Sequence, residues 1–136
     1  MPRKAVNTPT PTATRPPPAR LQAARAFAME AARLCADRRC RDVRVLQVAG
    51  LSPVTDFFVL ANAASARQMR SIAREVEELA GRHDLPPLAA HAEANETWTA
   101  IDCVDVILHL FSEKARAFYD LDNLWGDASE VPWSER

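Results

Sequence analysis

Apolar residues recur at steps of three and four positions in two stretches of this chain, a spacing that predicts two amphipathic helices. The first stretch covers residues 19–38, and its apolar face consists of Leu21, Ala24, Ala28, Ala31 and Cys35. The second stretch begins at Ser65, where Gln68 completes a capping box, and it ends at Gly81. The apolar face of this second helix consists of Met69, Ile72, Ala73, Val76, Leu79 and Ala80.

Short apolar runs between turn residues predict five β-strands and one further short helix. The runs cover residues 43–48, 57–60, 88–91, 98–103 and 105–111, and the helix extends from the cap Ser112 to about Tyr119. The run at 105–111 is almost entirely apolar, so we expect it near the centre of the sheet. This order of elements predicts a mixed five-stranded sheet with flanking helices, in the α/β or α+β class.

The start of the chain differs from the rest in composition. Residues 1–18 contain six of the ten prolines and too little apolar surface to fold, which predicts a disordered tail. Residues 1–29 lack acids, as transit peptides do, but proline at this density opposes the amphipathic helix that such a peptide forms. We expect the folded domain to cover residues 19–127, followed by a C-terminal tail over residues 128–136.

Charge is distributed unevenly along the sequence. All 18 acidic residues lie beyond residue 29, so the folded part carries a net negative charge. An acidic surface binds nucleic acid poorly and suits a basic protein partner. No stretch is apolar over the length that a membrane span needs, and no apolar run of a secretory signal follows the basic start. These features together predict a cytoplasmic protein that uses neither a membrane nor sequence-specific contacts to nucleic acid.

The cysteines and histidines do not form a recognisable metal or redox motif. Cys35, Cys40 and Cys103 have no CxxC spacing, so we expect buried thiols in a reducing compartment. His91 and Glu93 could share a strand face, but two candidate ligands make a weak metal site. We therefore expect no metal and no cofactor.

Two other stretches could carry enzyme chemistry. The loop after the second predicted strand, residues 62–65, reads Asn-Ala-Ala-Ser and lacks the glycines that let backbone approach a phosphate, so we expect it only to turn the chain. Asp56, Asp102 and Asp105 could hold Mg²⁺ for nucleotidyl transfer. Residues three apart on a continuous strand point to opposite faces, however, so Asp102 and Asp105 more readily serve the turn between two strands.

Aromatic residues among acids are the more promising signal. Trp98, Tyr119, Trp125 and Trp133 stand at element ends or in loops, close in sequence to several carboxylates. Aromatic side chains rimmed by charge are typical of protein interfaces, although the same residues could simply close the edge of the core.

Three segments of the sequence resemble the ribosomal silencing factors, also called the Iojap family, over roughly residues 20–127. The first is similar to the family's T-D-aromatic-aromatic-V strand and S-x-R-Q helix start, at Thr55, Asp56, Phe57, Phe58, Val59, Ser65, Arg67 and Gln68. The second is similar to the W-x-x-x-D-x-x-D-V-x-x-H-x-F strand pair, at Trp98, Asp102, Asp105, Val106, His109 and Phe111. The third is similar to the E-x-x-R-x-x-Y-x-L-[ED]-x-L-W tail, at Glu113, Arg116, Tyr119, Leu121, Asp122, Leu124 and Trp125.

The resemblance implies a fold similar to that of nucleotidyltransferases, without catalysis. It also implies binding to the large ribosomal subunit through its protein fourteen, where the small subunit joins, so that translation falls when nutrients are short. Family members are often homodimers in isolation. On this basis we expect the partner-binding residues to be Trp98, Asp102, His109, Arg116, Tyr119, Leu121, Asp122, Leu124 and Trp125.

The chain departs from the family pattern at three places. The family's glycine after the second strand is replaced near Asn62-Ala63, and its Glu-Gly after the third strand is Glu93-Ala94. Its usual Tyr-Gly between the two aspartates is Cys103-Val104. Alanine resists positive φ, so the first two departures bear on the local backbone conformation.

Overall fold

A computed structural model describes residues 18–83, 93–94 and 97–134. The elements in chain order are α1 (Pro18–Asp37), β1 (Arg41–Gln47), β2 (Phe57–Asn62), α2 (Ala66–Arg82), β3 (Glu93–Ala94), β4 (Trp98–Asp102), β5 (Val106–Phe111), α3 (Glu113–Tyr119), α4 (Leu121–Leu124) and β6 (Ser129–Val131). None of the helices in this described part has the length and apolar content needed to cross a membrane.

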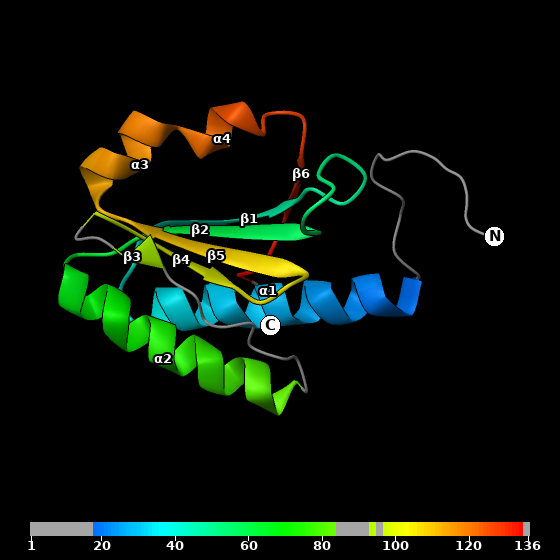
Figure 1. Cartoon of the computed structure of the whole chain (residues 1–136), viewed down its shortest axis with the longest axis horizontal. Coiled ribbons are helices and arrows are strands. Elements are labelled where there is room, and N and C mark those ends of the chain that lie inside the picture. The colour runs from blue at the N-terminus through cyan, green and yellow to red at the C-terminus, as the bar shows by residue number, and fades with distance from the viewer. Residues whose placement is uncertain (1–17, 84–92, 95–96, 135–136) are drawn as a thin grey trace.

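The strands form one mixed sheet with the order β3-β4-β5-β2-β1-β6. The central pair, β2 and β5, is parallel, and every other neighbouring pair is antiparallel. Helices α1 and α2 cover one face of the sheet, and the short helices α3 and α4 lie over the other (Figure 1). The predicted mixed α/β class is therefore confirmed, and the apolar run at 105–111 does supply a central strand.

The two faces of the sheet bury two separate apolar clusters. Because side chains alternate along a strand, Val59 and Leu108 pack under α1 and α2, whereas Phe58, Leu60 and Phe111 face α3 and α4. Helix α2 begins as predicted, with the Ser65 hydroxyl accepting a hydrogen bond from the Gln68 N–H at 3.1 Å.

The described part of the sheet includes two short strands, β3 and β6, that the sequence did not predict. The segment after residue 127, expected to be a tail, contributes β6, in which Val131 pairs with Val45 and Glu130 with Leu46. Trp133 follows and donates its indole N–H to the Val43 carbonyl at 3.1 Å. The strand predicted at 88–91 lies outside the described residues, and so does the tail predicted at 1–18 except for Pro18, which begins α1.

Strained backbone occurs in the β4–β5 turn. The departures from the family pattern had suggested such strain near Asn62-Ala63 and Glu93-Ala94 instead. Val104 has a φ of 71°, whereas Asn62 and Ala63 are not among the positive-φ residues of the described chain. Left-handed backbone is costly for a β-branched residue. The glycine missing between Asp102 and Asp105 is therefore the departure with a structural cost.

Replacing Val104 with glycine should raise the free energy of unfolding by about 1 kcal/mol, because glycine adopts positive φ without a Cβ clash. Urea denaturation of the variant measures the change. Val54→Gly is the matched control, since Val54 is exposed and does not have positive φ. It should be neutral or slightly destabilising, and equal gains from both substitutions would contradict the proposed strain.

Candidate functional site

The α3 and α4 face of the sheet gathers most of the predicted partner-binding residues. In the antiparallel pair of β4 and β5, Trp98 lies opposite Phe111 and Ala100 opposite His109. Paired residues point to the same face, so Trp98, His109 and Phe111 share one. The sequence left open whether Trp98 and His109 meet, and the strand register brings them together.

Ring contacts run continuously across this face. Trp98 lies 4.6 Å from Tyr119 and stacks on Phe111 at 5.2 Å, measured between ring centroids. Phe58 makes edge-on contacts with both His109, at 5.0 Å, and Trp125, at 5.4 Å. Such pairs stabilise packing beyond their buried area and hold the rings in fixed orientations.

Part of this ring cluster reaches solvent. Phe118 is 80% exposed, Leu124 70% and Tyr119 42%, and Trp98 and Trp125 are half-buried. We call these five residues the aromatic surface. Phe118 was not predicted from the sequence, although two adjacent aromatics at the end of a short helix were a usable signal.

His109 lies beneath the aromatic surface. Its Nδ1 accepts a hydrogen bond from the Trp98 indole N–H at 3.1 Å, so the ring hydrogen belongs on Nε2. Nε2 is buried and has no hydrogen-bond partner among the described residues. Burial lowers the pKa of His109 to about 4, and the imidazole is neutral at physiological pH. In this position His109 orients the indole of Trp98.

Arg116 and Asp122 form an ion pair that fixes α3 and α4 on the sheet. Arg116 is buried, and its Nε and Nη2 donate to the two oxygens of Asp122 at 2.8 and 2.9 Å. Its Nη1 donates to the Asp42 carbonyl and to Asn62 Oδ1 at 2.8 and 2.9 Å. One guanidinium thus connects the helical segment to the ends of β1 and β2.

A second arginine completes the pairing of Asp122. Arg44 donates to Asp122 Oδ2 at 2.6 Å and forms a two-bond ion pair with Glu130 on β6. Hydrogen bonding to Arg116, and then to Arg44, lowers the pKa of Asp122 to about 2. The carboxylate is already balanced by two guanidinium groups, so its main contacts are within the chain.

The remaining predicted contacts lie at the edges of this face. Leu121 packs against the apolar cluster beneath α3 and α4. Asp120 links the two helices with left-handed backbone, at a φ of 49°, and is exposed. An open hollow of about 520 Å³ beside the ion pair is lined by Glu113, Arg116, Asp120 and Asp122, among others. Exposed acids therefore border the aromatic surface.

Two of the three aspartates considered for Mg²⁺, Asp102 and Asp105, are engaged by other groups of the chain. Asp102 accepts a hydrogen bond from the Val104 N–H at 2.8 Å, which supports the β4–β5 turn. Asp105 forms an ion pair with Arg20 of α1, with contacts of 2.6 and 2.9 Å. Burial, and then the charge of Asp105, raises the pKa of Asp56. Within the described ranges, no group of three or more His, Cys, Asp or Glu side chains could hold a metal ion. This arrangement favours the turn interpretation over the catalytic one.

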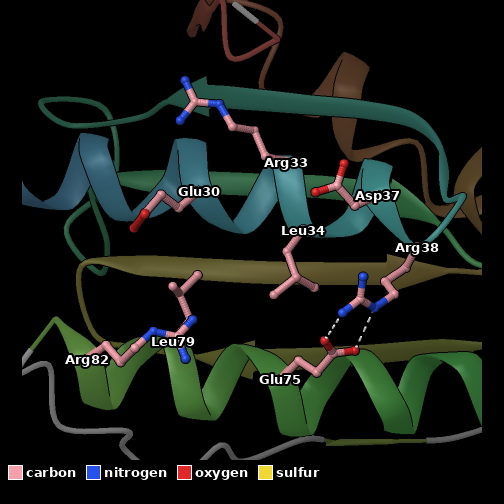
Figure 2. A pocket seen from close by; sticks show the side chains of 8 residues that line it. All are labelled: Glu30, Arg33, Leu34, Asp37, Arg38, Glu75, Leu79 and Arg82. Atoms are coloured by element: carbon pink, nitrogen blue, oxygen red, sulfur yellow. Dashed lines mark hydrogen bonds and ion pairs between the residues drawn. The ribbon is translucent and has the colours of Figure 1, made fainter. Parts of the chain in front are cut away.

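A groove of about 550 Å³ lies between α1 and α2, on the opposite side of the sheet. Figure 2 shows Leu34 and Leu79 between the helices and the guanidinium of Arg38 directed at Glu75. Arg33, also in its lining, donates to the Trp133 carbonyl at 3.0 Å. No predicted site residue lines this groove.

Comparison with known proteins places the whole described fold in one family. Residues 21–136 match the family model described as "Ribosomal silencing factor during starvation". The ribosomal silencing factor of Bacillus subtilis is 34% identical over 98 residues, which cover 72% of this chain and 83% of that protein.

Two crystal structures share the fold. A protein of Bacillus halodurans superposes with a TM-score of 0.63 at 28% identity, over 82% of this chain and 98% of the other. A protein of Chromobacterium violaceum gives a TM-score of 0.67 at 23% identity, over 85% and 93%. The likeness to nucleotidyltransferases stays a prediction.

Proposed function

Because the chain belongs to the ribosomal silencing factor family, we propose that it binds the large ribosomal subunit through that subunit's protein fourteen and sterically blocks joining of the small subunit. The family description, which refers to starvation, supports repression of translation under nutrient limitation as the setting. The observation that carries the proposal is the aromatic surface, an exposed apolar patch formed by α3, α4 and the start of β4. Without a partner, Phe118 and Leu124 would expose apolar surface to water, and exposed apolar patches mark interaction sites.

The proposed contact divides into apolar anchors and a charged rim. Trp98, Tyr119 and Trp125 supply rings whose orientations are set by their neighbours, so little side-chain entropy is lost on binding. Leu121 and Leu124 extend the apolar contact. Asp120 and Asp102 supply negative charge to a basic partner, while Arg116, Asp122 and His109 hold the anchors in place.

The proposed mechanism involves occupancy and no turnover. The factor would act for as long as it covers the joining face, so its effect would follow its concentration and its affinity. We further propose that it works in the cytoplasm, forms a homodimer when free, and makes no sequence-specific contact with nucleic acid. Asp105 is engaged by Arg20, and Asp102 by the β4–β5 turn. These contacts support action by occupancy over metal-dependent nucleotidyl transfer.

Truncating the most central exposed ring should weaken binding strongly. We expect Tyr119→Ala to cost about 2 kcal/mol, a roughly thirtyfold loss of affinity for large subunits, because Tyr119 packs on both Trp98 and Phe118. Co-sedimentation with purified large subunits measures this. Val54→Ala truncates an apolar side chain in the β1–β2 connection that is more exposed than Tyr119, and this variant should bind normally. Unchanged binding of Tyr119→Ala would remove the proposed anchor.

A sucrose-gradient profile tests the consequence of binding. Added protein should increase free large subunits at the expense of joined ribosomes, and Tyr119→Ala should do so only at much higher concentration. Incubation with Mg²⁺ and labelled nucleotides tests the enzymatic alternative. Nucleotidyl transfer that Asp102→Asn abolishes would favour that alternative.

A further inference from the structure

The end of α1 brings two free thiols together. The Arg39 N–H bonds to the Ala36 carbonyl at 2.9 Å and the Cys40 N–H to the Cys35 carbonyl at 3.0 Å, while Arg39 has a φ of 68°. This pair of bonds around a left-handed residue is the Schellman motif, in which the residue after the left-handed one packs against the residue five positions earlier. In this chain both of those residues are cysteines, and both are free.

The two thiols interact with each other and differ in character. A hydrogen bond between the side chains is the main cause that lowers the pKa of Cys40 and raises that of Cys35. Cys35 is fully buried, whereas Cys40 keeps 9% of its surface exposed and is the more accessible of the pair. Cys103 lies elsewhere, in the β4–β5 turn, and burial raises its pKa to about 11.

Contacts with α2 hold this turn in place. The side chain of Gln68 donates to the Arg38 carbonyl, and the Arg38 guanidinium is paired with Glu75, with one contact of 2.9 Å (Figure 2). The turn between the two cysteines is therefore attached to α2 through both the backbone and the side chain of Arg38. A fixed turn holds Cys35 and Cys40 at the two positions that pack against each other in this motif.

We propose that Cys35 and Cys40 are a site of reversible oxidation, at which a hydroperoxide converts the two thiols to an intramolecular disulfide. The Cys40 thiolate attacks the outer oxygen of the hydroperoxide, which breaks the O–O bond, releases the other oxygen as an alkoxide (hydroxide from hydrogen peroxide) and leaves a sulfenic acid on Cys40. The Cys35 sulfur then attacks the Cys40 sulfur, its proton leaves with the sulfenic oxygen as water, and the S–S bond forms. A dithiol reverses the change by exchange.

Hydrogen peroxide applied to the folded full-length chain tests this site. After alkylation of remaining thiols, trypsin cuts beside the arginines between the cysteines, so the disulfide appears as the peptide 34–38 joined to the peptide 40–41. We expect this species to form while Cys103 stays reduced and is recovered as the alkylated residue. The species should disappear after treatment with dithiothreitol. Oxidation of Cys103 at the same rate, or cross-links between chains in its place, would overturn the proposal.

Two variants assign the roles of the thiols. Cys103→Ala should form the same linked peptides at an unchanged rate. Cys40→Ala should slow the loss of the Cys35 thiol at least about tenfold, because the more accessible, lower-pKa thiol is gone. Equal loss of Cys35 in Cys40→Ala, in protein whose circular dichroism matches the parent, would contradict the mechanism. These results do not depend on ribosome binding, so they stand or fall separately from the proposed function.

Discussion

Replacing Arg116 with methionine should lower the free energy of unfolding by about 3 kcal/mol, the largest loss we expect from a single polar side chain. Methionine fills much of the volume but leaves the Asp42 carbonyl and Asn62 Oδ1 without their shared donor. It also leaves Asp122 with only Arg44 as a counter-charge. Urea denaturation at neutral pH, followed by tryptophan fluorescence, measures the change.

Arg38→Met is the matched control for Arg116. The Arg38 guanidinium also pairs with a carboxylate through two bonds, but it is half exposed to solvent. An exposed ion pair of this kind is screened by solvent and contributes little to stability, so the variant should be close to the parent in stability. Equal losses from the two substitutions would show that burial of Arg116 is not the source of the effect.

The same buried ion pair explains why the site could be predicted only in part from the sequence. The family resemblance singled out Arg116 and Asp122 as partner contacts, and within the chain the structure pairs these two side chains with each other. The positions that complete the network, Arg44 on β1 and Asn62 at the end of β2, are far away in the sequence. No local pattern links them, because their proximity depends on how the strands pair.

Burial of His109 could be inferred more easily than the Arg116 network, because it follows from the sequence of one strand. In β5 the residues on its face are Ile107 and Phe111, and a histidine between two apolar neighbours indicates a core position. The bond to Trp98 could not be inferred, since it depends on the register that sets Ala100 opposite His109. Strand register follows from tertiary packing rather than from the periodicity of one strand.

The elements of the fold show the same contrast between features that one segment determines and features that depend on pairing with distant segments. Helix α2 was predicted from its apolar period and capping box, and both are intrinsic to its own sequence. Strand β6 has only three residues, two of them exposed, and depends on pairing with β1 and on the contact between Arg44 and Glu130. Helix α4 has only four residues and buries none of them, so no periodicity could indicate it.

Acidification should destabilise the fold by about 3 kcal/mol between pH 7 and pH 4 through His109 alone. Its pKa is about 4 in the folded protein and 6.5 when unperturbed. A depressed pKa means that the unfolded state takes up the proton first, so this contribution is fully present above pH 6.5 and is lost as the pH falls towards 4. Asp122 adds to acid sensitivity only below its ordinary value of 3.8, because its own pKa is about 2.

A non-titrating variant isolates this effect. In His109→Asn the side-chain oxygen takes the position of Nδ1 and can still accept the hydrogen bond from the Trp98 indole, but the group carries no proton equilibrium. The variant should lose most of the slope of unfolding free energy against pH between 6.5 and 4. His83→Asn, on the more accessible pair with Glu30, should keep that slope. If both variants retain the parent slope, the acid sensitivity arises elsewhere, and His109 is not held neutral beneath the aromatic surface.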